Sequence, residues 1–186
     1  MEVRIVSAVG AAHNPFLDAL CVLIDGVFGP MGSVLLGLLL LAWTLLFTGT
    51  WRGALRAGVL LAFPWAVAEG MKLVVRRPRP EPSALTRVIV PDPFTFSFPS
   101  GHTAFATALV CALVLSLASV RARRAAAIAG AVVVLAVAWS RVYLGVHYPT
   151  DVVAAIVVAA AVAVPLNRVV SRMGPLRVDA GTQARR

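Results

Sequence analysis

The chain has 186 residues, of which 60% are hydrophobic and only 13% are charged, and its mean hydropathy is +0.88. Because soluble domains carry about 25% charged residues, this composition excludes an ordinary water-soluble enzyme and a disordered tail. The formal net charge is +9. The basic residues stand at the ends of apolar runs, where membrane orientation and anionic head groups explain them better than a nucleic-acid partner does. We therefore expect a single domain that crosses a membrane several times.

The first apolar segment, Pro15–Phe28, is too short to span a bilayer and carries two acids, Asp18 and Asp25. These acids are seven residues apart, so they share one face of a helix. The pattern predicts an amphipathic helix that lies in the membrane interface within an N-terminal segment, residues 1–32. A tilted extra span joined to the next run is the alternative. His13, just before this helix, is interpreted as a surface residue.

Five runs between residues 33 and 170 are each long and apolar enough to cross a membrane, or nearly so, because a spanning helix needs about 20 mostly apolar residues. The runs are Ser33–Thr50, Ala54–Val75, Gly101–Ser119, Ala125–Val142 and Val152–Val170. The expected fold class is all-α. It is a polytopic membrane helical bundle with about five transmembrane helices plus the N-terminal interfacial helix.

The segment Arg76–Pro99 contains six prolines, which predicts an ordered loop outside the membrane. With five spans, the ends of the runs alternate between the two sides of the membrane. One side receives ten arginines and a single acid, Asp179, and the positive-inside rule makes that side cytoplasmic. The basic tail, residues 171–186, is then cytoplasmic. The ten arginines are Arg52, Arg56, Arg121, Arg123, Arg124, Arg168, Arg172, Arg177, Arg185 and Arg186.

Three polar clusters fall on the opposite side, each beside the end of a span. They are Lys72–Pro80, Pro99–His102 and Ser140–Asp151. If the spans pack as a bundle, these clusters meet at one face of the membrane. Lys72, the only lysine in the chain, would be brought close to two arginines, Arg79 and Arg141.

The cations in these clusters suit a phosphate-like anion, because arginine can bind a phosphate through two parallel hydrogen bonds. Ser100 stands before a helix that is expected to begin near Gly101. The free N–H groups and the dipole at such a helix start favour an anion. Gly101 would let the backbone approach the ligand closely.

The third element is a set of two histidines and an aspartate: His102, His147 and Asp151. Asp151 follows His147 by four residues, so it can accept a hydrogen bond from one imidazole nitrogen and leave the other free as a nucleophile. His102 would then donate a proton to the leaving oxygen. No cluster of Asp and Glu offers a two-metal site, so we expect a metal-free mechanism with no cofactor.

The pattern K-x6-R-P, then P-S-G-H, then S-R-x5-H-x3-D resembles the type-2 phosphatidic acid phosphatase superfamily. All eleven specified positions match, in order. They are Lys72, Arg79, Pro80, Pro99, Ser100, Gly101, His102, Ser140, Arg141, His147 and Asp151. The resemblance implies a helical bundle with its site at the outer membrane face, which agrees with the side derived from the arginines.

The resemblance also implies a role for each site residue. His147 would attack phosphorus and form a phosphohistidine, Asp151 would orient it, and His102 would protonate the leaving group. The phosphoryl oxygens would be held by Lys72, Arg79, Ser100, Gly101 and Arg141.

The implied function is hydrolysis of a membrane lipid phosphate or diphosphate. Polyprenyl diphosphate is favoured, and phosphatidylglycerophosphate, phosphatidic acid and a polyprenyl-linked sugar phosphate are the other candidates. Transfer of the phosphoryl group to an acceptor other than water and a non-catalytic lipid-phosphate binder are the alternatives.

Four further charged residues lie near the clusters. Glu69 is expected to pair with Lys72 or Arg79, because a carboxylate within a span usually has a partner. Arg76, Arg77 and Arg87 would either attract an anionic head group or be solvated loop charges.

Overall fold

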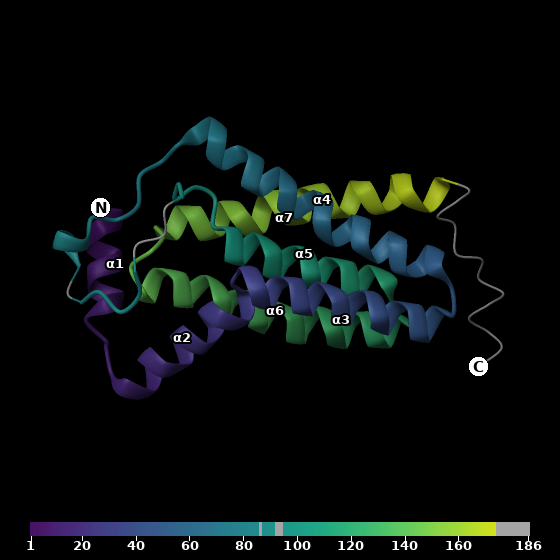
Figure 1. The fold of residues 1–186 in the computed structure, drawn as a ribbon, viewed down its shortest axis with the longest axis horizontal. Coiled ribbons are helices and arrows are strands. Elements are labelled where there is room, and N and C mark those ends of the chain that lie inside the picture. The colour runs from purple at the N-terminus through teal and green to yellow at the C-terminus, as the bar shows by residue number, and fades with distance from the viewer. Residues whose placement is uncertain (86, 92–94, 174–186) are drawn as a thin grey trace.

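A computed structural model describes residues 1–85, 87–91 and 95–173 (Figure 1). Most of the basic tail, residues 174–186, lies outside the described residues. The described part contains seven α-helices, one short 3-10 turn at Pro82–Ala84, and no strand. The helices are α1 (Glu2–Gly10), α2 (Pro15–Phe28), α3 (Pro30–Thr48), α4 (Trp51–Val75), α5 (Gly101–Ser116), α6 (Val120–Tyr143) and α7 (Pro149–Arg172).

The helix ends follow from residues with capping preferences. The side chain of Asn14 accepts a hydrogen bond from Leu17 N at the start of α2, and Thr50 accepts one from Gly53 N at the start of α4. Gly49 ends α3 with a left-handed backbone, φ 64°, which glycine adopts without steric cost. The Leu-, Val- and Ala-rich runs between such residues therefore become uninterrupted helices.

The expected fold class is confirmed, and each of the five expected spans is a helix. α3, α4, α6 and α7 are long and apolar enough to cross a membrane, whereas α5 is apolar but has only 16 residues. The sequence did not predict α1, which is bent by 118° relative to α2. The pair α1–α2 is apolar enough to count as one broken span, so the described residues hold four candidate spans, or five with this pair.

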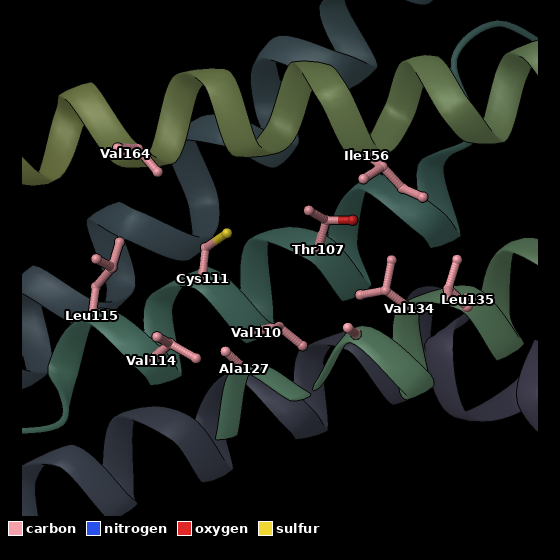
Figure 2. Close-up of a pocket in the computed structure, with 11 residues that line it drawn as sticks. Thr107, Val110, Cys111, Val114, Leu115, Ala127, Val134, Leu135, Ile156 and Val164 are labelled. Atoms are coloured by element: carbon pink, nitrogen blue, oxygen red, sulfur yellow. The ribbon is translucent and has the colours of Figure 1, made fainter. Parts of the chain in front are cut away.

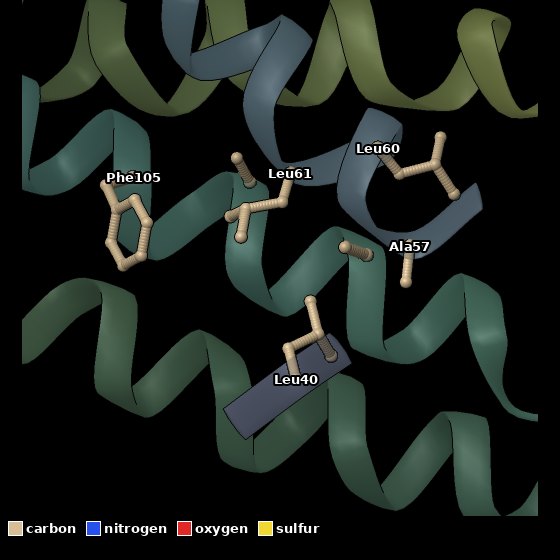
Figure 3. Packing of buried hydrophobic residues seen from close by; sticks show 7 residues of the cluster. Leu40, Ala57, Leu60, Leu61 and Phe105 are labelled. Carbon is tan, nitrogen blue, oxygen red and sulfur yellow. The ribbon is translucent and has the colours of Figure 1, made fainter. Parts of the chain in front are cut away.

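α5 is the central helix and packs against α4, α6 and α7 (Figure 1). Its buried residues are mostly small, which lets neighbouring backbones approach closely in a membrane. At Gly130 of α6, an added Cβ would lie 2.3 Å from the side chain of Val110 on α5. The largest apolar cluster joins α3, α4 and α5 through Leu40, Leu60, Leu61, Ala57, Phe105, Ala108 and Ala112 (Figure 3).

α6 and α7 make few contacts with each other and are joined mainly through α5. An apolar cavity of ≈ 370 Å³ lies between these three helices (Figure 2). Thr107 is the one hydroxyl in its lining, and that hydroxyl already donates to Thr103 O at 2.8 Å. The cavity therefore offers apolar surface and little else.

The polar side chains of the N-terminal helices contact other parts of the protein, whereas an interfacial helix would turn them toward water. Asp18 accepts a hydrogen bond from the Tyr143 hydroxyl at 2.7 Å and lies 3.0 Å from His13 Nδ1. The interpretation of His13 as a surface residue is wrong, because its side chain is 10% exposed and its ring packs edge-on against Tyr143. The acidic face of α2 thus points into the protein.

Candidate active site

The three polar clusters lie at one end of the bundle, where α4 and α6 end and α5 and α7 begin (Figure 1). Ser100 N donates to Asp151 O at 3.1 Å, which ties the start of α5 to the start of α7. Ser97 N donates to Arg77 O at 2.8 Å, which ties the end of the proline-rich loop to its beginning. The clusters, far apart in the sequence, therefore share one region.

His147 and Asp151 form a buried pair. The distance from His147 Nδ1 to Asp151 Oδ2 is 3.5 Å, and the two side chains are 3% and 0% exposed. Burial lowers the pKa of His147 to about 4, with the nearby cations of Arg79 and Lys72 acting in the same direction. The imidazole is therefore neutral at pH 7, the form that a nucleophile needs.

Three donors hold the carboxylate of Asp151. Tyr148 N donates to Oδ2 at 2.8 Å, the Ser97 hydroxyl donates to the same oxygen, and Arg77 Nη1 donates to Oδ1 at 2.8 Å. A buried carboxylate requires such partners, because an unpaired buried charge is strongly unfavourable. Asp151 is therefore fixed in position beside the ring of His147.

Arg79 lies beside the other nitrogen of His147. Its Nη1 atom is 3.2 Å from His147 Nε2 and donates to Val146 O at 2.6 Å. Its Nε atom donates to Thr95 O at 2.8 Å. Backbone carbonyls thus hold the guanidinium next to the imidazole nitrogen that does not face Asp151.

Lys72 reaches the start of α5. Its Nζ atom lies 3.0 Å from Glu69 Oε1, which confirms the expected pairing of Glu69. A Cβ added at Gly101 would lie 2.9 Å from Lys72 Nζ and 2.3 Å from Glu69 Oε1, so only glycine fits there without displacing the pair. Ser100 is fully buried at the N-cap of α5. A cation and a helix start therefore face the same space.

Arg141 is 1% exposed, so its charge needs a partner. Its Nη1 atom forms an ion pair with Asp25 Oδ1 on α2, and its Nε atom donates to Ser140 Oγ at 3.2 Å. Its buried Nη2 atom has no hydrogen-bond partner among the described residues. This N–H group therefore still lacks an acceptor in the part of the chain that the structure describes.

His102 lies on the first turn of α5, with Nε2 3.2 Å from Asp25 Oδ1. Asp25 is thus shared between His102 and Arg141. All eight residues expected to form the site are at this end of the bundle, where their partners come from α4, the loop, α5, α6 and α7.

Sequence reasoning missed three residues that touch the site: Asp25, Ser97 and Arg77. Asp25 carried a signal, since two acids share a face of an otherwise apolar helix in a chain with few acids. Arg77 was left open between head-group attraction and solvated charge. It is neither, because it bridges Asp151 and Glu2 and stacks 4.0 Å from the ring centre of Tyr148.

Known proteins with similar sequences are named as phosphatases or a diphosphatase. The family model of the PAP2 superfamily matches residues 53–174. A decaprenylphosphoryl-5-phosphoribose phosphatase of Mycolicibacterium smegmatis is 42% identical over 100 residues, which are 54% of this chain and 49% of that protein. The chain thus spans about half the length of that relative. The undecaprenyl-diphosphatase BcrC of Bacillus subtilis is 30% identical over 148 residues, covering 79% of this chain and 72% of that protein.

Two solved structures share the fold. A PAP2-type phosphatidylglycerolphosphate phosphatase from Bacillus subtilis aligns with a TM-score of 0.75 and 22% identity, over 92% of this chain and 87% of that one. Aquifex aeolicus LpxE aligns with a TM-score of 0.69 and 20% identity, over 88% of this chain and 93% of that one. These likenesses support the all-helical membrane architecture.

Proposed function

Since this chain belongs to the PAP2 superfamily, we propose that it is an integral membrane phosphatase that hydrolyses a polyprenyl-linked phosphate or diphosphate without a metal ion. The observation that carries the proposal is the buried imidazole of His147, with Asp151 beside one ring nitrogen and Arg79 beside the other. Binding a lipid phosphate needs the cations but not an oriented nucleophile. The pairing of His147 with Asp151 therefore favours an enzyme over a binding protein.

The first step is attack of His147 Nε2 on phosphorus. The N–P bond forms as the bond from phosphorus to the leaving oxygen breaks, and His102 donates a proton to that oxygen. Asp151 stabilises the positive charge that develops on the ring of His147. The products of this step are a phosphohistidine and the dephosphorylated lipid.

The second step returns the enzyme to its starting state. His102, now neutral, takes a proton from water while the water oxygen attacks phosphorus and the N–P bond breaks. Inorganic phosphate leaves, and His147 is again neutral. Lys72, Arg79, Arg141, Ser100 and the backbone N–H group of Gly101 would hold the phosphoryl oxygens through both steps, because charge stabilisation on these oxygens is the main catalytic contribution in phosphoryl transfer.

The lipid class is part of the proposal. Two relatives carry names that refer to polyprenyl-linked substrates, and polyprenyl diphosphate stays the favoured substrate. Phosphatidylglycerophosphate and phosphatidic acid are the competing candidates, and the chemistry of the site suits all of them because it contacts the phosphate.

The deciding experiment measures phosphate release by the purified protein in detergent from polyprenyl diphosphate, a polyprenyl-linked sugar phosphate, phosphatidylglycerophosphate and phosphatidic acid. Each is assayed with and without EDTA, beside His147→Ala as the blank. We expect release that survives EDTA and is greatest for a polyprenyl substrate. Loss of activity in EDTA contradicts the metal-free mechanism. A folded protein that releases no inorganic phosphate but phosphorylates an added acceptor alcohol is a phosphotransferase.

The acid limb of the pH profile is the first prediction from the site. A free histidine is half protonated near pH 6.5, whereas His147 has a pKa of about 4. Protonation removes the nucleophile, so kcat/KM is expected to stay near its maximum at pH 5.5 and to fall by half near pH 4. Because the phosphate group of the substrate also titrates, kcat/KM is calculated at each pH from the concentration of one ionic form of the substrate. If kcat/KM instead falls by half near pH 6.5, and activity recovers fully on return to pH 7, the lowered pKa of His147 is contradicted.

The orientation in the membrane gives the second prediction. The arginine distribution favours an active site on the extracytoplasmic face and a C-terminus in the cytoplasm. In a Cys21→Ala, Cys111→Ala background, an impermeant maleimide is expected to label Glu81→Cys in intact cells. It should label Val120→Cys, at the opposite end of the bundle, only after permeabilisation. The reverse pattern contradicts this orientation.

A further inference from the structure

The carboxylate of Asp25 lies outside the residues that match the family model, yet it contacts two residues of the site. Asp25 is near the end of α2, and the family match begins at residue 53. Its Oδ1 atom is 3.2 Å from His102 Nε2 and forms an ion pair with Arg141 Nη1. One oxygen atom of α2 thus meets side chains from both α5 and α6.

α2 is held firmly enough to place this carboxylate. Ile24 and Phe28, on either side of Asp25, pack against the apolar cluster that joins α5 and α6. Seven residues before Asp25, on the same face, Asp18 accepts a hydrogen bond from the Tyr143 hydroxyl at the end of α6. The helix is therefore fixed on both sides of Asp25, and its carboxylate is directed at His102 and Arg141.

The other charged groups at this end of the bundle have different partners. From α4, Glu69 pairs with Lys72, and from α7, Asp151 pairs with Arg77 and faces His147. Arg141, from α6, pairs with Asp25 itself. α3 carries no charged residue. Among the residues that the structure describes, Asp25 is thus the carboxylate that directly faces His102.

We propose that Asp25 is a positioning residue for His102, orienting its ring so that the other ring nitrogen donates a proton to the leaving oxygen. The arrangement repeats that of His147 and Asp151 with the nitrogens exchanged. Asp151 faces Nδ1 of His147 and leaves Nε2 for phosphorus, whereas Asp25 faces Nε2 of His102 and leaves Nδ1 for the leaving oxygen. The Nδ1–H bond breaks as the bond from phosphorus to that oxygen breaks. This inference rests on the proposed phosphatase activity.

The test uses two small substrates that differ in their need for a proton donor. The leaving group of hexyl phosphate is an alkoxide, which needs a proton as it departs. The leaving group of 4-nitrophenyl phosphate is a stable phenolate, which needs little help from a proton donor. General acid catalysis contributes about 10²- to 10⁴-fold. We expect Asp25→Asn to lower kcat/KM, which reports formation of the phosphohistidine, by about 10- to 100-fold for hexyl phosphate and by less than about threefold for 4-nitrophenyl phosphate. Asp25→Glu, which keeps the carboxylate, should restore part of the loss.

Two controls separate positioning from a structural role. Asp18→Asn removes the other acid on the same face of α2, and it is expected to change both substrates equally. His102→Ala should show the same selective loss for hexyl phosphate, and adding Asp25→Asn to it should cause little further loss, because the two residues act as a unit.

The outcomes distinguish this inference from the proposed function. An equal loss of kcat/KM on both substrates in Asp25→Asn, or a full further loss on top of His102→Ala, overturns the positioning role. So does a lower KM at unchanged kcat, which would make Asp25 a competitor of phosphate for Arg141. If instead His147→Ala keeps activity on either substrate, the proposed function fails.

Discussion

Replacing His147 with alanine is expected to lower phosphate release by at least about 10⁴-fold, the largest effect of any single substitution in this chain, because no phosphohistidine can form without its imidazole. The cations proposed to bind the phosphate remain, so the variant should still bind the substrate. The measurement is single-turnover phosphate release together with acid- and base-stability of the labelled protein. Wild type should carry a phosphate that is lost in acid and kept in base, and His147→Ala should carry none.

The other two histidines supply matched controls for this result. His102→Ala is expected to lose about 10²- to 10⁴-fold, the usual contribution of a proton donor, and to keep forming some phosphoenzyme. His13→Ala removes a ring that contacts Asp18 and Tyr143 rather than the catalytic residues, so its loss should be only a few fold. Phosphoenzyme on His147→Ala, or an equal loss in all three variants, contradicts the assignment of His147 as the nucleophile.

Much of the fold was predictable because membrane spans are encoded locally. A run of about 20 apolar residues has few alternatives to a helix in a bilayer, and all five expected spans are helices. The convergence of Lys72, His102 and His147 followed from the alternation of span ends, which requires no knowledge of packing. Glu69 was also paired correctly, since a carboxylate three residues from a lysine on a helix can reach it.

The missing part of the site depends on contacts that no local pattern specifies. Asp25 meets Arg141 across 116 residues of sequence, and Arg77 meets Asp151 across 74. The apolar pattern of α2 predicts a helix but does not decide whether its acidic face turns to water or to protein. The decision comes from Tyr143 and Arg141 on α6, whose polar groups need partners at that face.

These long-range contacts give the two N-terminal helices a role in the site. Glu2 of α1 accepts hydrogen bonds from Arg77 and from Thr150 at the start of α7, while Asp25 of α2 contacts His102 and Arg141. Glu2 neutralises Arg77 and Asp25 neutralises Arg141. Without these acids, the two arginines would repel the other cations of the site. The N-terminal segment therefore completes the charge balance around residues that the family motifs contribute.

Asp151→Asn is expected to lower phosphate release by about 10³- to 10⁴-fold, as a neutral amide of the same size cannot stabilise the positive charge that develops on His147. The amide also presents N–H groups to donors at Tyr148 N, Ser97 and Arg77. A buried donor left without an acceptor costs about 1–3 kcal/mol, so a lower melting temperature should accompany the loss. Both are measured on the same detergent-purified sample.

Arg77→Gln and Ser97→Ala separate the catalytic effect of Asp151 from its structural effect. Each variant removes one donor to the carboxylate of Asp151 but keeps the negative charge of Asp151 beside His147. Each should therefore lower the rate by about tenfold or less. Each should also lower the melting temperature, as Asp151→Asn does. If rate follows melting temperature across the three variants, Asp151 is only an anchor between α7 and the loop. If Asp151→Asn alone loses three or more orders of magnitude, its charge acts on His147 during the reaction.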